Sequence, residues 1–356
     1  MILYLDKDNK TFAFSVGLKC YTFVRQHTKM SKKKVGVVCG GFSSEFEISI
    51  LSGKTVFLNL DRDLFEVYLI TIRPDVWTAV DDYKTSFKVS KGDFSLISDN
   101  HNVKLDVIFN MIHGAPGENG QLAALWELLK IPFSSCDSYN AALTFNKRDC
   151  LSVLRSWDVP TAKHFALNHG DPIDLIKIQK VVGLPCFVKA NRAGSSYGVY
   201  RVNIKSELEP AILDAFREDH QLIIESALEG KEVSVGVAEF NNKITVLPIT
   251  EVISENDFFD YAAKYEGKAQ EITPAKIKES SKIEVEKWSR LIYKKLGLKG
   301  VVRSEFIFVD DIPHLLEINT VPGMTSKSII PQQVSAMGIE LSDFFSYLLQ
   351  TALKQE

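Results

Sequence analysis

The stretch VVRSEFIFVDDIPHLLEINT, residues 301 to 320, contains two runs of β-branched, aromatic and aliphatic residues around a short polar interruption. The interruption is DDIP, residues 310 to 313, and aspartate and proline both favour turns. The stretch therefore predicts a β-hairpin. Because side chains alternate between the two faces of a strand, charged residues spaced two apart on both strands can share one face.

Four polar side chains lie near the open end of this hairpin: Arg303 and Glu305 on the first strand, Glu317 and Asn319 on the second. If the hairpin folds about Asp311, Glu305 lies opposite Glu317 and Arg303 opposite Asn319. Two opposed carboxylates repel each other in a half-buried sheet, and a divalent cation relieves the repulsion. An all-oxygen set with few protein ligands favours Mg²⁺ shared with substrate phosphates. The alternative is a solvated face with an ordinary Arg–Glu pair.

A candidate phosphate loop precedes the hairpin. Lys189 ends the apolar run CFVKA and is followed by GSSYG, residues 194 to 198, whose small residues let backbone N–H groups approach an anion. It is not a Walker loop, since the lysine precedes the glycines, and an ordinary loop is the alternative. Glu225 and Glu232 flank a segment whose backbone could bind an adenine edge, while one of the two acids could bind ribose hydroxyls. The alternative is that they are two surface glutamates beside a linker.

The composition restricts the class of protein. With 356 residues the chain is long enough for two or three domains, and 42 basic against 45 acidic side chains provide no general attraction for nucleic acid or an anionic membrane. No stretch approaches the roughly 18 to 20 apolar residues of a membrane span. Five dispersed cysteines indicate neither a disulfide framework nor a zinc site and fit a reducing cytoplasm.

The first thirty residues differ from the rest. Asp6 and Asp8 precede a short apolar patch where a signal peptide should be basic. Met30 is followed by the segment SKKK and then by an apolar run that predicts a strand. This is a common way for a domain to begin. We therefore expect residues 1 to 29 to lie outside the fold, and we treat residues 1 to 33 as an N-terminal extension.

From Lys34 onward the pattern alternates short β-branched runs with helical periodicity, which predicts an α/β fold. The strands expected in a first, Rossmann-like domain at residues 34 to 137 are 35–39, 65–72 and 105–112. Helices should follow the first strand, starting near Ser43, and the third strand, over 121–130. Both connecting loops lie at strand C-termini, where open α/β sheets bind ligands.

Further elements are expected beyond this domain. They are a helix over 146–157, strands at 186–190, 222–225, 232–238 and 244–249, and a helix that places Val285, Trp288, Ile292 and Leu296 on one face and ends at Gly297. The chain shows no internal repeat and no low-complexity linker.

Five motifs, taken together and in this order, resemble the D-alanine:D-alanine ligases of the ATP-grasp superfamily. They are GGFSSEFEIS (40–49), HGAPGENG (113–120), FVKANRAGSSYG (187–198), YAAKY (261–265) and LEINTVPGMTSKS (316–328). The resemblance runs from about Lys34 to the C-terminus. It implies an ATP-grasp fold with a central subdomain at 138–227 and a C-terminal subdomain at 228–356, which carries the metal and substrate site.

The resemblance also implies ATP as co-substrate and two divalent cations, Mg²⁺ or Mn²⁺. The residues that it assigns to ATP are Lys147, Lys189, Ser195, Ser196, Glu225, the backbone of Ala227 and Leu228, Glu232 and Lys264. The residues that it assigns to the cations are Glu305, Glu317 and Asn319. Glu305 stands where aspartate is the common residue of the family, but it keeps the charge and the oxygen ligand.

On the substrate side the resemblance implies two D-alanines joined through an acylphosphate for peptidoglycan precursors. Glu45 would hold the first ammonium group and form a triad with Ser195 and Tyr265, beside His113. Ser328 and the Ile329 backbone would hold the second carboxylate, while Arg303 and the Gly323 N–H would face the oxyanion. Residues 255 to 275 would form a lid. The family also suggests a cytoplasmic homodimer.

Three other functions are weighed against this one. A D-alanine:D-lactate ligase is the first, although such relatives typically lack the lysine–tyrosine pair that Lys264 and Tyr265 provide here. Another ATP-grasp carboxylate–amine ligase is the second, and the motifs around Glu45 and Ser328 argue against it. A nucleotide-binding regulatory protein without turnover is the third, and it predicts loss of Arg303 or of the metal carboxylates, which this chain keeps.

Overall fold

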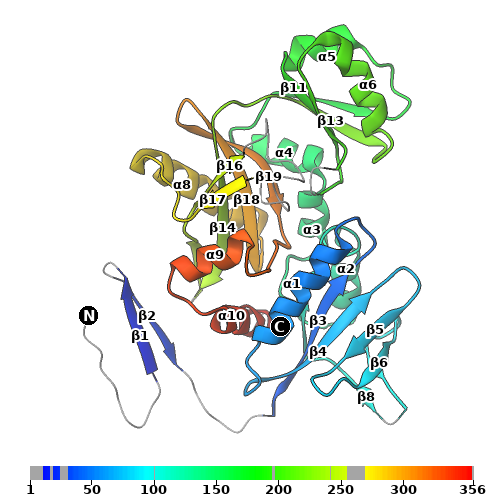
Figure 1. Ribbon diagram of the computed structural model, residues 1–356, viewed down its shortest axis with the longest axis vertical. Helices are drawn as coiled ribbons and strands as arrows, with labels where there is room; N and C mark the ends of the chain where they lie inside the picture. The colour runs from blue at the N-terminus through cyan, green and yellow to red at the C-terminus, as the bar shows by residue number, and fades with distance from the viewer. Residues whose placement is uncertain are drawn as a thin grey trace. The chain divides into compact units, whose positions relative to one another are not determined.

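A computed structural model describes residues 11–16, 19–24, 31–99, 101–194, 197–240, 242–254 and 269–354. The chain divides into two compact units, Met1–Lys32 and Lys33–Glu356. In the first unit, β1 (Thr11–Val16) and β2 (Lys19–Val24) form an antiparallel hairpin. In the second unit lie three sheets and the helices that cover them (Figure 1). No helix among the described residues is long and apolar enough to cross a bilayer.

The first sheet of the second unit has seven strands in the order β8-β7-β6-β5-β4-β3-β9. Its parallel part consists of β3 (Lys33–Gly40), β4 (Phe65–Ile72) and β9 (Val107–Asn110). Its antiparallel extension consists of β5 (Trp77–Val80), β6 (Ser86–Val89), β7 (Leu96–Ile97) and β8 (Asn102–Val103). The sequence patterns did not predict the extension, because strands this short carry little periodic signal.

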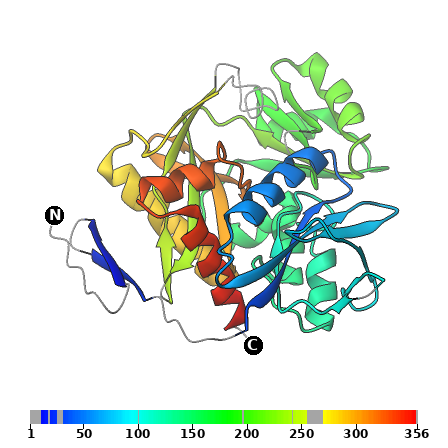
Figure 2. The same cartoon turned by 60° about the horizontal axis from the view of Figure 1, so that its bottom comes forward.

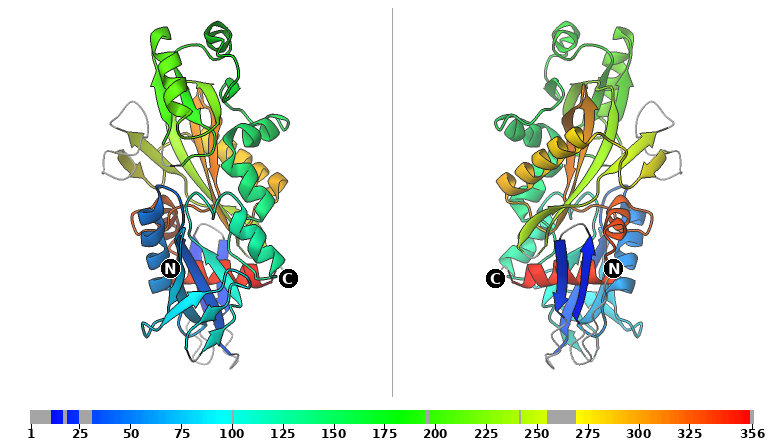
Figure 3. Two further views of the ribbon diagram at one scale, coloured as in Figure 1. Left: turned by 90° about the vertical axis from the view of Figure 1, so that its right-hand side faces the viewer. Right: turned by 90° about the vertical axis from the view of Figure 1, so that its left-hand side faces the viewer.

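Helices cover both faces of this first sheet (Figure 3). Val35, Val37 and Cys39 on one face pack with α1 (Phe46–Asn59) and α10 (Leu341–Leu353). Val38 on the other face packs in the cluster that contains Trp126 of α2 (Gln121–Leu128). Burial of β3 on both faces explains why its sequence is apolar without alternation.

The central sheet has four antiparallel strands in the order β10-β13-β11-β12. They are β10 (His164–Asn168), β13 (Gln221–Ser226), β11 (Cys186–Ala190) and β12 (Val199–Val202). Two helices, α5 (Leu175–Val182) and α6 (Lys205–Ala215), close its apolar face and share its core. Before this sheet come α3 (Ser138–Phe145) and α4 (Lys147–Arg155), and α4 packs instead on the third sheet through Cys150, Leu151 and Leu154.

The third sheet has the order β17-β16-β14-β18-β19, with β15 paired to β14. Its strands are β14 (Lys231–Phe240), β15 (Lys243–Val246), β16 (Thr250–Ser254), β17 (Ala269–Ile272), β18 (Val301–Val309) and β19 (Ile312–Asn319). One face packs on α8 (Glu279–Leu296), which ends at Gly297 with φ 65° as predicted. The short helix α9 (Ile329–Ala336) follows the hairpin.

The C-terminal helix α10 belongs to the core of the first sheet rather than to that of the third. Phe345 is fully buried, and its ring centroid lies 5.5 Å from that of Phe109 in β9. The helix α10, in red, lies beside α1, in blue, in both Figure 1 and Figure 2. The two ends of the second unit therefore share one hydrophobic core.

Several expected boundaries are corrected. The strand expected at 105–112 is only 107–110. The Asp106 carboxylate accepts the Lys34 N–H at 2.7 Å just before this strand begins. The first helix begins at Phe46 rather than near Ser43, and the second ends at Leu128 rather than at residue 130. The strand expected at 244–249 is 243–246, since it leaves β14 after Val246.

The hairpin turn is also shorter than predicted. Asp310 and Asp311 alone connect Val309 to Ile312, with φ of 50° and 64°, so the turn has two residues instead of four. A two-residue turn with two positive φ values matches the right-handed twist of the strands. Ile312 and Pro313 therefore belong to β19.

Candidate active site

A cavity of about 410 Å³ lies where the three sheets meet. Its walls come from the loops after β3 and β9, from the start of α4 and the loop after β11, and from the hairpin with the segment that follows it. The residues of the predicted site that line it are Glu45, His113, Lys147, Arg303, Glu317, Asn319, Gly323, Ser328 and Ile329. Nine residues that were assigned to the site from different parts of the sequence thus line one cavity.

The hairpin pairs its polar residues as predicted: Arg303 lies opposite Asn319 and Glu305 opposite Glu317. The hairpin reaches this pairing through a shift in register that was not predicted. The ladder from the turn to Phe306 and Leu315 would place Glu305 opposite Leu316, but the register shifts between Glu305 and Phe306. This β-bulge takes up Leu316 and brings the two acids together.

Glu305 has an incompletely satisfied carboxylate. Its Oε1 lies 2.6 Å from Arg303 Nε and accepts the Ser234 hydroxyl at 3.2 Å. Its buried Oε2 has no hydrogen-bond partner among the described residues. An unpaired buried carboxylate oxygen is costly, and a divalent cation is a ligand that would satisfy it.

The donor set fits Mg²⁺ or Mn²⁺. Glu305, Glu317 and Asn319 provide hard oxygens only, and the Asn319 Oδ1 already accepts the Val321 N–H at 2.9 Å, which fixes the amide. Among the described residues, no three His, Cys, Asp or Glu side chains cluster as a metal site by themselves. If a cation binds here, the protein would provide two acids and one amide. The repulsion between the acids is also smaller than expected, since Glu305 contacts Arg303.

Lys147 connects the loop after β11 to Glu317 of the hairpin. Its Nζ donates to the Ala193 carbonyl at 2.6 Å and lies 3.3 Å from Glu317 Oε2. The lysine is the first residue of α4, whose N-cap is Asn146. Lys147, Ala193 and Glu317 all line the cavity, so a phosphate entering here would meet the lysine between the loop and the hairpin.

Lys189 forms a buried ion pair with Glu225, with 2.8 Å between Nζ and Oε2. Burial alone would lower the pKa of Lys189, but the Glu225 carboxylate and the more distant Glu317 and Glu232 raise it above its usual value. The second oxygen of Glu225, Oε1, is buried without a hydrogen-bond partner among the described residues. An exocyclic amino group of a base is a donor that could satisfy it.

Among the described residues assigned to the nucleotide, Lys147 lines the cavity, and these do not: Lys189, Glu225, Ala227, Leu228 and Glu232. Glu232 lies on β14 two residues from Ser234, on the same face of the sheet as Glu305. The Ala227 N–H is used within the protein, because it donates to the Pro185 carbonyl at 3.0 Å. Leu228 follows Ala227 in the connection to β14. Ser195, Ser196, Lys264, Tyr265 and most of the segment assigned to the lid lie outside the described residues.

Glu45 is the N-cap residue of α1, and its carboxylate faces the phosphate loop. A Cβ atom on Gly194 would lie 2.5 Å from Glu45 Oε2, so a side chain at this position would displace the carboxylate. Glycine therefore allows the close approach of the loop after β11 to Glu45. The triad of Glu45 with Ser195 and Tyr265 stays a prediction, because both partners lie outside the described residues.

His113 holds two walls of the cavity together. Its Nδ1–H donates to the Val321 carbonyl at 2.8 Å, and its Nε2 accepts the Ser52 hydroxyl at 3.2 Å. The Ser52 oxygen in turn accepts the Met324 N–H at 3.2 Å. Burial lowers the pKa of His113, although Glu45 opposes the effect, so the imidazole is neutral. With both ring nitrogens used, His113 orients the loop after β19.

The start of α9 forms the opposite wall. Ser328 is the N-cap residue, and its hydroxyl oxygen accepts the Thr325 N–H at 3.1 Å. Gly323 lies close to it, since a Cβ there would be 2.9 Å from Ser328 Oγ. The positive end of a helix with a hydroxyl group beside it suits a carboxylate.

Three charged residues of the cavity were missed from the sequence: Glu118, Glu271 and Lys327. Glu118 accepts the Gly114 N–H at 2.6 Å, and burial, reinforced by Glu45, raises its pKa to about 8. Glu118 lies inside the motif HGAPGENG (113–120), which is the signal that could have identified it. Glu271 lies on β17 and accepts from Gln332 at 2.5 Å. It lies within the segment assigned to the lid, residues 255 to 275, where no separate role was predicted for it.

Comparison with known proteins gives a consistent result. Residues 34–136 match the family model for the D-ala D-ala ligase N-terminus, and residues 153–350 match the model for the D-ala D-ala ligase C-terminus. The chain belongs to the D-alanine–D-alanine ligase family. A D-alanine–D-alanine ligase from Flavobacterium johnsoniae is 48% identical over 321 residues, which cover 90% of this chain and 99% of the relative. One from Christiangramia forsetii is 49% identical over 325 residues, covering 91% and 100%.

Solved structures of similar proteins confirm the ATP-grasp fold of the D-alanine–D-alanine ligase family for this chain. D-alanyl-alanine synthetase A from Vibrio cholerae superposes with a TM-score of 0.81 at 28% identity, covering 91% of this chain and 99% of that one. The VanG D-Ala:D-Ser ligase from Enterococcus faecalis gives 0.80 at 28%, covering 90% and 100%. D-alanine–D-alanine ligase from Bacillus anthracis complexed with ATP gives 0.74 at 26%, covering 92% and 98%.

Family membership confirms the predicted resemblance and the expectation of an ATP-dependent ligase. It argues against the alternative of a nucleotide-binding regulatory protein without turnover.

Proposed function

We propose that this chain joins two D-alanine molecules into D-alanyl-D-alanine for peptidoglycan precursors at the expense of ATP. The observation that carries the proposal is the set of groups that line one cavity. They are Glu45, Lys147, Glu317 and, at the N-terminus of α9, Ser328. Two amino acids and a phosphate need an acid for an ammonium group, a cation for the phosphate and a helix terminus for a carboxylate.

These groups would bind the two amino acids and ATP as follows. The carboxylate of Glu45 would hold the ammonium group of the first D-alanine, with Ser195 and Tyr265 completing the triad. The Ser328 hydroxyl and the Ile329 N–H would hold the carboxylate of the second. Lys147, Lys189 and Lys264 would bind ATP phosphates beside Ser195 and Ser196, while Glu225, the Ala227–Leu228 backbone and Glu232 would bind the adenosine.

The reaction then has two steps. A carboxylate oxygen of the first D-alanine attacks the γ-phosphorus, the bond to ADP breaks, and an acylphosphate forms. The amine of the second D-alanine attacks the acyl carbon, loses a proton, and expels phosphate. Arg303 and the Gly323 N–H would stabilise the oxyanion as it develops. Glu305, Glu317 and Asn319 would hold two Mg²⁺ or Mn²⁺ ions, which neutralise phosphate charge during transfer.

We propose the following assignments for the parts of the chain. Residues 34–137 contribute the first D-alanine site, 138–227 and 228–356 enclose ATP, and residues 1–33 are an extension. The protein acts as a homodimer in the cytoplasm, and the free, buried Cys39, Cys136, Cys150 and Cys186 fit a reducing compartment.

A substrate panel tests the proposed function. The release of phosphate from ATP is measured in the presence of Mg²⁺. The substrates are D-alanine, L-alanine, or D-alanine combined with D-lactate or D-serine. D-alanine alone should stimulate release strongly, and L-alanine should not. Preferential use of D-serine as the second substrate is the specific alternative, because a D-Ala:D-Ser ligase is among the similar structures. Absence of stimulation by any D-amino acid would exclude the proposal.

A further inference from the structure

Asn191 is a fully buried polar residue that directly follows β11, and the reaction proposed above gives it no role. Its side chain makes three hydrogen bonds. The Oδ1 accepts the Arg148 N–H at 2.8 Å, and the Nδ2 donates to Asn146 Oδ1 at 2.8 Å and to Gln221 Oε1 at 3.2 Å. Its backbone adds two more, from its N–H to the Gln221 carbonyl at 3.0 Å and from the Lys147 N–H to its own carbonyl at 3.3 Å.

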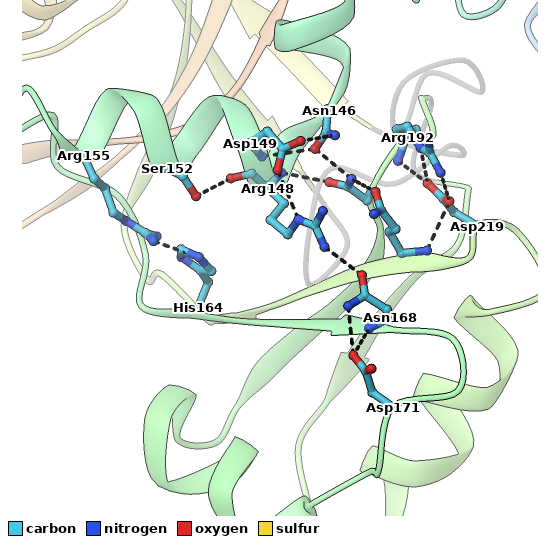
Figure 4. Close-up of polar contacts among 12 residues, drawn as sticks. Asn146, Arg148, Asp149, Ser152, Arg155, His164, Asn168, Asp171, Arg192 and Asp219 are labelled. Carbon is cyan, nitrogen blue, oxygen red and sulfur yellow. Dashed lines mark hydrogen bonds and ion pairs between the residues drawn. The ribbon is translucent and has the colours of Figure 1, made fainter.

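These five bonds connect three segments that are far apart in the sequence. Asn146 and Lys147 are the N-cap and the first residue of α4, and Asn146 Oδ1 also accepts the Asp149 N–H at 3.1 Å. Gln221 is the first residue of β13. Figure 4 shows Asn146, Arg148 and Asp149 at the helix end, close to Arg192 and Asp219.

The segment after Asn191 is anchored as well. Arg192 donates to Asp219 three times, from its backbone N–H at 2.9 Å, from Nε at 3.0 Å and from Nη2 at 2.7 Å (Figure 4). Asp219 is 7% exposed in its side chain. The next residues, Ala193 and Gly194, line the cavity. Asn191 is therefore fixed to the first residue of β13, and Arg192 to Asp219 two residues before it.

Asn191 joins two of the elements that reach the cavity from the central part of the chain, where Thr144 and Phe145 of α3 also line it. One is Lys147, whose Nζ lies 2.6 Å from the Ala193 carbonyl. The other is the turn at Ala193 and Gly194. The Asn191 side chain is one of several links between α4 and the central sheet, beside those of Arg148 to Asn168 and of Arg155 to His164, both at 3.0 Å. It is distinguished by its partners, since Asn146 and the Arg148 N–H flank Lys147.

We propose that Asn191 is a positioning residue for ATP, which fixes Lys147 relative to the turn at Ala193 and Gly194 so that both meet the same phosphates. The inference rests on the proposed role of these two elements in binding ATP. A preformed arrangement of donors avoids the ordering cost that a flexible one would add to binding. A buried amide suits this role because it can donate and accept at once in a fixed plane.

The first test compares two kinetic constants in Asn191→Ala. The KM for ATP should rise by about tenfold or more, which corresponds to losing the net effect of one to two hydrogen bonds. The KM for D-alanine should change by less than about twofold, because Glu45 and Ser328 belong to other elements. A merely structural role would change both constants together, or neither, and would overturn the proposal.

The matched control is Asn168→Ala. Asn168 accepts from Arg148 Nη1 at 3.0 Å and donates to Asp171 at 2.9 Å, so it lies in the same network but on its exposed side (Figure 4). This variant should keep both KM values within about twofold. If Asn191→Ala does not fold, Asn146→Ser provides the same test, because serine still caps α4 but is too short to reach Asn191.

A double-mutant measurement separates positioning from binding. The Kd for ATP is measured directly by calorimetry in wild type, Asn191→Ala, Lys147→Ala and the double variant. Asn191→Ala should weaken ATP binding by a clearly smaller factor in the Lys147→Ala background, because the group that it positions is gone. Equal factors in both backgrounds would contradict the proposal. A wild type that binds ATP without joining D-alanine would contradict the proposed function only, since this measurement needs no turnover.

Discussion

Glu118 has a buried carboxyl group near two other acids of the cavity, Glu45 and Glu317. Burial, with these charges, raises its pKa from 4.5 to about 8, although the Gly114 N–H and Arg303 act in the opposite direction. The folded protein therefore binds more protons than the unfolded chain between these two values. As a result, this group makes the protein less stable as the pH rises through that window.

Replacement of Glu118 by glutamine should remove this pH dependence, because glutamine resembles the protonated carboxyl group. We expect the Tm of Glu118→Gln relative to wild type to increase between about pH 5 and about pH 8. Thermal melts in a series of buffers measure the difference. Parallel curves for the two proteins would show that Glu118 does not titrate in this window.

Gly194 is the point at which the phosphate loop touches the first domain. An added methyl group would meet Glu45 Oε2 at 2.5 Å and displace that carboxylate. Gly194→Ala should therefore lower kcat/KM for D-alanine by about 100-fold, as expected for a misplacement of about 1 Å in a site. The matched control is Gly92→Ala, where the nearest atom lies 3.9 Å away and activity should be unchanged. Equal activity of the two variants would remove Glu45 from the site.

At the scale of single residues, the sequence predicted which residue types form the site but not where every side chain points. Arg303, Glu317 and Asn319 were found because strand alternation fixes their face. Glu118 and Glu271 were missed because no periodicity applies in a glycine-rich loop or in a four-residue strand at a sheet edge. Their proximity to the cavity depends on contacts with Gly114 and Gln332.

At the scale of elements, the hairpin shows how a correct pairing can arise from an incorrect turn. The predicted centre at Asp311 and the observed turn at Asp310–Asp311 differ by half a residue, and the bulge at Leu316 compensates. A bulge has no signature in a single sequence, so this detail was not predictable. The strands at 65–72 and 186–190 were predicted to the residue because their apolar residues are bounded by turn signals.

The helix α10 is expected to contribute strongly to the stability of the second unit. Phe345 is fully buried among residues of β3, β9 and α1. Phe345→Ala should cost about 3 to 5 kcal/mol of unfolding free energy through lost burial and a cavity. Chemical denaturation measures the loss. As a control, Leu58→Ala on the exposed face of α1, 75% exposed, should stay within about 0.5 kcal/mol. A small loss in Phe345→Ala would mean that α10 is not part of this core.

At the scale of the second unit, segments distant in the sequence complete one cavity. His113 joins the loop after β9 to Val321, more than two hundred positions later, and α10 returns to the first sheet. Neither connection has a local signal, because both are tertiary contacts between apolar or neutral groups. The sequence predicted which motifs belong to the site, and the fold of this unit shows how the described ones meet.

The central claim is that a D-alanine carboxylate is phosphorylated by ATP and then joined to a second D-alanine. The most direct measurement uses D-alanine labelled with ¹⁸O in both carboxylate oxygens, together with ATP and Mg²⁺, and mass spectrometry of the products. If the account is right, D-alanyl-D-alanine forms and each released phosphate carries one ¹⁸O atom from the first substrate. Unlabelled phosphate, or labelled D-alanine recovered without any dipeptide, would contradict it.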